Sequence, residues 1–227
     1  MIIMLDKIVE KTEERLREAM EKKSLDDLKQ EVSKLEINSD FPFKEALKDP
    51  QIAIIAEVKK ASPSKGLIAE DFDYVEIAKE YEQAGASAIS VLTEPYFFQG
   101  SNDYLAEIAQ NVSIPILRKD FVIDEYMIWQ AKALGASAIL LIVSILDTVQ
   151  LKKYLDLAHD LGLSAIVETH DASEISTSPS VITPMAYSLS KSSSTKPLTI
   201  KLFIEKHSVK VSSTMGLSLF SQNSALR

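Results

Sequence analysis

The chain has 227 residues, of which 46% are hydrophobic and 26% are charged, and its formal net charge is −8. This mixture is typical of an ordinary folded domain. The length indicates one domain, because a single α/β barrel needs about 250 residues. The acidic balance argues against a nucleic-acid partner, and the absence of cysteine excludes disulfides, thiolate metal sites and a cysteine nucleophile.

The first 48 residues predict a helical extension. Apolar residues recur at helical spacing from Leu5 to Met20, and Ser24 with Asp27 is typical of an N-cap before a second helix. The start lacks the apolar core of a secretory signal, and no run of about 18 apolar residues occurs, so we expect a cytoplasmic protein without a membrane partner. Because residues 1–48 show no strand pattern, we expect them to pack on the main domain.

Three similar joints recur in the middle of the chain. Each has a glycine after a helical pattern and then an apolar run, which is typical of a helix end followed by a buried strand. Together with apolar runs at 52–58 and 114–117, they predict five βα units, in a barrel or in a doubly wound sheet. The joints are Gly85-Ala-Ser-Ala-Ile89, Gly135-Ala-Ser-Ala-Ile139 and Gly162-Leu-Ser-Ala-Ile166.

Charged residues stand at the ends of three predicted strands: Glu57 and Lys59 on the first, Lys119 on the third and Glu168 on the fifth. In a βα barrel the carboxyl ends of the strands share one rim, where reactive groups lie. Alternation places Glu57 and Lys59 on the same side of their strand, where they either do acid/base work or form a plain ion pair. Adding Lys119 and Glu168 favours a reactive site.

A polar turn follows the first of these strands. It reads Ala61-Ser-Pro-Ser-Lys-Gly66, and its backbone N–H groups, hydroxyls and ammonium suit a carboxylate or a phosphate. Taken alone, the same residues are more typical of an ordinary turn. We expect Trp129, His159 and His170 to be structural.

Several stretches of the chain, including the strand ends and the polar turn described above, resemble indole-3-glycerol-phosphate synthases over about residues 1–171. The resemblance implies a (β/α)8 TIM barrel and a carboxy-lyase of tryptophan biosynthesis, which uses no metal and no cofactor. It also implies a phosphorylated small-molecule substrate, 1-(2-carboxyphenylamino)-1-deoxyribulose 5-phosphate, which is converted to indole-3-glycerol phosphate. The similar stretches begin with Met4-Leu-Asp-Lys-Ile-Val9, which resembles the family's extra N-terminal helix, and continue through Ile55-Ala-Glu-Val-Lys-Lys-Ala-Ser-Pro-Ser-Lys-Gly66, 90–101, 115–124, 138–143 and 166–168.

The resemblance also implies residue roles. Lys119 is expected to be the general acid, Glu168 to take a proton in the later dehydration, and Lys59, beside Glu57, to lie near the anionic groups of the substrate. How the two lysines divide the acid role stays open. Around this cluster, Ser62 and Pro63 are expected to shape the first loop, and Phe98, Phe121 and Leu140 to line an aromatic pocket.

The composition changes after Asp171. The family's Asn-x-Arg, Ser-Glu-Ser-Gly and final Gly-Ser motifs do not occur there, and residues 175–227 are rich in Ser, Thr and Pro. We therefore expect a helical extension over 1–48, five βα units over 49–174, and an atypical tail over 175–227 that does not form the barrel.

An abrupt change of this kind is typical of a shifted reading frame. A fragment of five units leaves open strand edges, through which copies of the chain could self-associate. Two alternatives to the lyase follow: an inactive truncated or frame-shifted barrel fragment, and a sibling phosphate-binding barrel isomerase.

Overall fold

The computed structural model describes the backbone of residues 2–48, 52–69, 71–170, 174, 200–205, 208–215 and 217–221, and the side chains of 4–48, 53–69, 71–170 and 174. The helices are α1 (Ile2–Lys22), α2 (Leu25–Val32), α3 (Pro42–Ala46), α4 (Tyr74–Gln83), α5 (Asn102–Asn111), α6 (Glu125–Ala133) and α7 (Thr148–Asp160), with a 3-10 turn at Val143–Ile145. The strands are β1 (Ile52–Val58), β2 (Ala61–Ser62), β3 (Gly66–Leu67), β4 (Ala88–Leu92), β5 (Ile116–Lys119), β6 (Ala138–Ile142), β7 (Ser164–Thr169), β8 (Ile200–Glu205), β9 (Ser208–Met215) and β10 (Leu217–Ser221).

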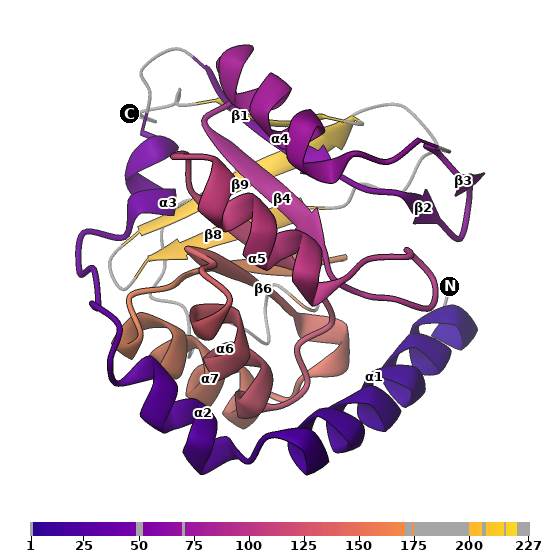
Figure 1. Cartoon of the computed structure of the whole chain (residues 1–227), viewed down its shortest axis with the longest axis vertical. Helices are drawn as coiled ribbons and strands as arrows, with labels where there is room; N and C mark the ends of the chain where they lie inside the picture. The colour runs from indigo at the N-terminus through magenta and orange to yellow at the C-terminus, as the bar shows by residue number, and fades with distance from the viewer. Residues whose placement is uncertain are drawn as a thin grey trace.

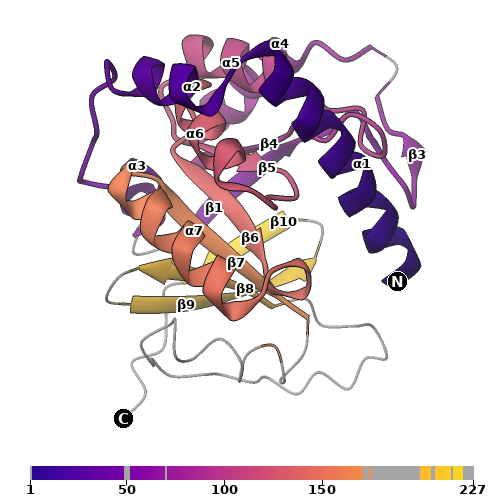
Figure 2. The ribbon, with the colours of Figure 1, turned by 90° about the horizontal axis from the view of Figure 1, so that it is seen from below.

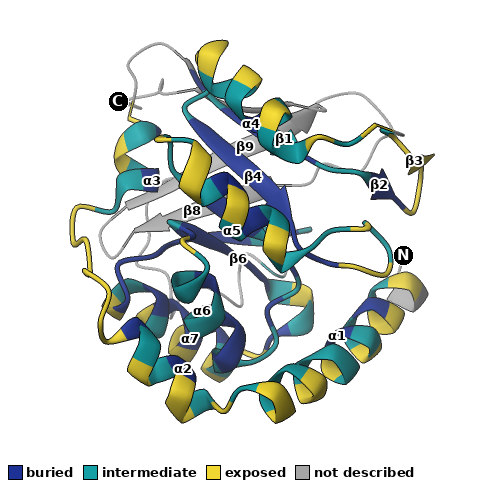
Figure 3. Cartoon of the chain, in the orientation of Figure 1, coloured by how far each residue is buried: buried dark blue, intermediate teal, exposed yellow. Residues whose placement is uncertain are grey.

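Strands β1, β4, β5, β6 and β7 lie side by side and parallel in a curled sheet, with α4 to α7 on its outer side (Figure 1). The residues of β4 and β6 are all buried, because one face packs on helices and the other on the barrel interior. Figure 3 shows these strands as buried and the outer helix faces as exposed. The prediction of five βα units in a barrel is confirmed.

The glycines of the three predicted joints have the left-handed backbone expected there. Gly85, Gly135 and Gly162 have φ values of +87°, +90° and +70°. At Gly162 a side chain would also collide, because a Cβ would lie 2.6 Å from the carbonyl oxygen of Asn38. This joint therefore fixes the segment after α2 against the turn that leads into β7.

Three antiparallel strands close the sheet between β7 and β1. Strand β8 pairs with β7, β9 with β8, and β10 with both β9 and β1; Figure 2 shows β8 and β9 next to β7. This pairing satisfies the backbone groups that β1 and β7 would otherwise leave open. The domain boundaries and the self-association remain predictions.

The N-terminal helices pack on the outside of the barrel, at the lower edge in Figure 1. Ser24 caps α2 as predicted, with its Oγ accepting from the backbone N–H of Asp27 at 3.1 Å. On α1, Ile8 and Thr12 are buried, and on α2, Leu28 is buried. The extension is therefore bound to the domain by both apolar packing and polar contacts.

Candidate active site

The carboxyl ends of the parallel strands surround a cavity of about 210 Å³. Residues from β1, from the end and following loop of β4, from β5 and its loop, and from β6 line this cavity. The structure therefore brings most of the predicted site residues into one place. The lining residues are Glu57, Lys59, Leu92, Phe98, Lys119, Asp120, Phe121 and Leu140.

Two ion pairs organise the charges at this rim. Lys59 Nζ pairs with Glu57 Oε1 along β1. Lys119 Nζ on β5 lies 3.5 Å from Glu168 Oε2 on β7, and these two side chains are only 20% and 13% exposed. A shielded ammonium next to a carboxylate provides a proton donor and a proton acceptor in one place. Glu168 thus joins the site through Lys119.

The apolar side of the cavity contains two aromatic rings. The ring centroids of Phe98 and Phe121 are 6.1 Å apart, and their planes are inclined by 36°. Leu140 is 1% exposed and belongs to the core of the barrel. These three side chains form a surface that suits the flat face of an aromatic ligand.

The first loop lies beside the cavity rather than in its lining. Ser62 is nearly buried, and its Oγ accepts from the backbone N–H of Lys65 at 3.3 Å. Pro63 is exposed on the turn between β2 and β3. The backbone N–H of Ala61 donates to the carbonyl oxygen of Phe98 at 3.2 Å. The loop is therefore joined to the segment that carries one of the aromatic rings.

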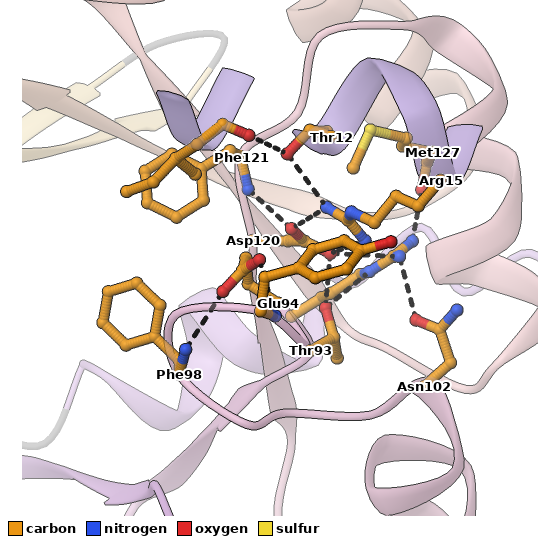
Figure 4. Close-up of polar contacts among 12 residues, drawn as sticks. Thr12, Arg15, Thr93, Glu94, Phe98, Asn102, Asp120, Phe121 and Met127 are labelled. Atoms are coloured by element: carbon orange, nitrogen blue, oxygen red, sulfur yellow. Dashed lines mark hydrogen bonds and ion pairs between the residues drawn. The ribbon is translucent and has the colours of Figure 1, made fainter. Parts of the chain in front are cut away.

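A buried polar network surrounds Asp120, the residue that follows Lys119 in the chain (Figure 4), and the sequence analysis did not predict it. The guanidinium of Arg118 is completely buried and donates to the Thr93 hydroxyl at 3.2 Å and to the backbone carbonyl of Met127 at 2.8 Å. It also lies 3.2 Å from Asp120 Oδ2. Its remaining partners are the side-chain oxygens of Asn102 and Gln130, at 3.0 Å and 2.7 Å.

Asp120 is the centre of this network. Arg15 on α1 donates to both of its carboxylate oxygens, and the backbone N–H of Phe121 donates to Oδ1 at 2.8 Å. Burial alone would raise the pKa of Asp120, but the charges of Arg15 and Arg118 and hydrogen bonds from Arg15 and Thr93 hold it below its usual value. Burial lowers the pKa of Arg118 to about 10, although Asp120 opposes this.

Glu94 shapes the loop that carries Phe98. Its side chain is fully buried, and its carboxylate accepts from the backbone N–H groups of Tyr96, Phe97 and Phe98 at 3.0, 2.7 and 3.0 Å. The loop then returns at Gly100, where a Cβ would lie 2.3 Å from the carbonyl oxygen of Leu92. The buried carboxylate of Glu94 and the close approach at Gly100 together fix the loop that carries the ring of Phe98.

His170 also lies at this rim, although the sequence analysis treated it as structural. Its Nε2 lies 3.4 Å from Glu168 Oε1, and its Nδ1 lies 3.5 Å from Glu174 Oε2. The alternation of β7 could have identified it, because residues two apart on a strand share a face.

The described residues offer little for other kinds of site. Among them, no group of three His, Asp or Glu side chains is arranged to hold a metal ion. No helix in the described part of the chain is long and apolar enough to cross a membrane. A further hollow of about 450 Å³ lies between α1, the β4–α5 loop and α6, and it contains none of the predicted site residues.

A barrel with five parallel strands, whose carboxyl ends bring together paired lysines and glutamates, defines a βα-barrel protein with a candidate acid/base site. Residues 5–184 match the family model described as indole-3-glycerol phosphate synthase, and the chain belongs to this family. The recognition made from the sequence is thereby confirmed.

Curated relatives show the same similarity. The chain is 52% identical over 173 residues to the indole-3-glycerol phosphate synthase of Ruminiclostridium cellulolyticum and 56% identical over 173 residues to that of Lacticaseibacillus paracasei. Each match covers 76% of this chain and 66% of the relative. The synthase of Lachnoclostridium phytofermentans is 47% identical over 184 residues, with 76% and 68% covered. The chain thus matches about two thirds of the length of these relatives.

Proposed function

We propose that the chain carries the lyase chemistry of its family, in the cytoplasm and as a step of tryptophan biosynthesis. The reaction closes the pyrrole ring of 1-(2-carboxyphenylamino)-1-deoxyribulose 5-phosphate, with loss of CO2 and water, to give indole-3-glycerol phosphate. The cavity carries this proposal, because it places an aromatic pair, Phe98 and Phe121, beside the ammonium of Lys119.

Lys119 is the general acid in the first half of this reaction. The aryl carbon that bears the carboxylate attacks the carbonyl carbon of the ribulose chain and forms a new C–C bond, and Lys119 protonates the carbonyl oxygen as it becomes a hydroxyl. CO2 then leaves, and the electrons of its bond restore the aromatic ring. The two phenylalanine rings hold the aryl group in line for the attack.

Glu168 is the base in the second half. The new hydroxyl takes up a proton supplied by solvent and leaves as water, and Glu168 takes the proton that must be lost to form the double bond of the pyrrole. Its 3.5 Å separation from Lys119 lets the two groups exchange a proton and return to their starting state. Lys59, oriented by Glu57, binds the anionic groups of the substrate.

A second candidate is an inactive fragment, favoured by the absence of the family's three later motifs after Asp171. Phosphate binding supplies remote binding energy that lowers the activation barrier of the reaction. Loss of phosphate binding would therefore reduce activity by orders of magnitude. In that case, supplying the last βα units of a relative as a separate polypeptide would restore turnover.

The test is an assay of the full chain with the carboxyphenylamino substrate, followed through the fluorescence of the indole product. The substrate of a sibling isomerase is assayed in parallel, because that enzyme also binds a phosphorylated compound in a barrel. Turnover of the first substrate alone supports the lyase. Turnover of the isomerase substrate alone, or of neither one even with the added βα units, contradicts it.

A further inference from the structure

We propose that His170 is a positioning residue, which holds the Glu168 carboxylate between its own imidazole and the ammonium of Lys119. The consequence for catalysis rests on the proposed lyase function, whereas the contact itself does not. Glu168 lies on β7 between the buried Val167 and Thr169, and His170 directly follows the last residue of the strand. The side chains of Glu168 and His170, two positions apart, meet at the rim.

The two oxygens of Glu168 face two different basic side chains. Oε2 lies 3.5 Å from Lys119 Nζ, and Oε1 lies 3.4 Å from His170 Nε2. A carboxylate with one partner can rotate or pair through both oxygens with the same lysine, whereas one with a partner on each oxygen has a fixed orientation. His170 thus prevents Glu168 from collapsing onto Lys119.

Glu174 fixes the imidazole in turn. Its Oε2 accepts from the backbone N–H of His170 at 2.6 Å and lies 3.5 Å from Nδ1 of the same residue. The ring is therefore placed between two carboxylates, Glu168 and Glu174, and is 27% exposed. Among the described residues, the titratable groups of this cluster are Lys119, Glu168, His170 and Glu174.

The electrostatics agree with this geometry. Hydrogen bonding to Glu168 is the main cause that raises the pKa of His170 above its ordinary value of 6.5, and the charges of Glu168 and Glu174 add to it, while burial opposes them. The imidazolium is therefore favoured next to Glu168, and it carries donors on both nitrogens.

The contact is tested by an NMR titration of the imidazole resonances of the full chain. The His170→Gln variant assigns the His170 signal, and Glu168→Gln and Glu174→Gln remove each carboxylate without changing its shape. We expect the His170 midpoint to fall toward 6.5 in Glu168→Gln and to fall by less in Glu174→Gln. An unchanged midpoint in Glu168→Gln overturns the proposal whether or not the chain is active.

Kinetics test the catalytic consequence. His170→Ala is expected to lower kcat about tenfold with little change in KM, because the substrate still binds while the base is misplaced. His170→Gln keeps an N–H donor and should recover part of the loss. His159→Gln, on α7, is the control for a histidine replacement away from the rim. Equal kcat in His170→Ala and wild type overturns the positioning role. If wild type shows no turnover even with the added βα units, the lyase proposal fails and the titration alone decides on the contact.

Discussion

Arg15 and Asp120 are 105 positions apart in the sequence, yet the two guanidinium nitrogens of Arg15 donate to the two carboxylate oxygens of Asp120. This pair connects the N-terminal helix to the end of β5, one residue beyond Lys119. The carboxylate is also bound by the buried Arg118, so one acidic group pairs with two cations. The helical extension is therefore part of the support of the candidate active site.

Replacing Asp120 by Asn should destabilise the fold by about 3 kcal/mol or more, because it leaves a buried guanidinium without its counter-charge. The control is Asp156→Asn, which breaks an exposed ion pair with Lys152 on α7. Urea unfolding of both variants measures the difference, and the control should change little. Similar midpoints for the two variants would show that the network does not hold the fold together.

The same carboxylate predicts a dependence of stability on pH. The pKa of Asp120 in the folded chain lies below its ordinary value of 3.8, so its contribution is fully present above that value and is lost as the pH falls through the folded pKa. The gap in unfolding free energy between wild type and Asp120→Asn should stay constant from about pH 7 to about pH 5 and shrink below about pH 4. If the difference in unfolding free energy persists undiminished in acid, the destabilisation by Asp120→Asn comes from packing and not from the charge of Asp120.

The barrel and much of the site followed from local rules. Glycine joints and apolar runs indicated the βα units, and the geometry of strand ends placed Lys59 and Lys119 at one cavity. The same rules could not predict that Arg118 and Asp120 meet Arg15, because that contact depends on where the extension packs. They also did not reveal that Glu94 caps a loop, since an acidic residue after a strand is usually solvated.

The closure of the sheet by β8 to β10 was outside these rules as well. Strands β8 and β10 contain apolar residues typical of strands, as in Ile200-Lys-Leu-Phe-Ile-Glu205, but they follow no βα repeat. Their pairing depends on the two edges that the parallel strands present, which no local rule describes. The order of these three strands is antiparallel, so they do not continue the βα repeat.

Two glycines provide a matched test of the joints. Gly85 and Gly162 both have positive φ, but a Cβ at Gly85 meets nothing within 4 Å, whereas one at Gly162 lies 2.6 Å from the Asn38 carbonyl oxygen. Gly85→Ala should cost about 1 kcal/mol from backbone strain alone, and Gly162→Ala should cost clearly more. Thermal unfolding of both variants measures this, and equal losses would refute the close approach.

The origin of the residues after Asp171 is tested by resequencing the gene across codons 165 to 185 and translating all frames downstream. A shifted frame predicts the family's Asn-x-Arg, Ser-Glu-Ser-Gly and Gly-Ser motifs, in that order, in another frame. If no frame contains them, the frameshift hypothesis is wrong and the Ser/Thr/Pro-rich residues belong to the natural sequence.

The most direct test of the proposed function compares wild type with Lys119→Met in the indole-forming assay. Loss of a general acid typically costs about 10²-fold to 10⁴-fold in rate. We predict measurable product with wild type, alone or with the missing βα units supplied, and product at the background rate with Lys119→Met under the same conditions. Equal rates for the two chains, or no product from wild type even with the added units, would contradict the account.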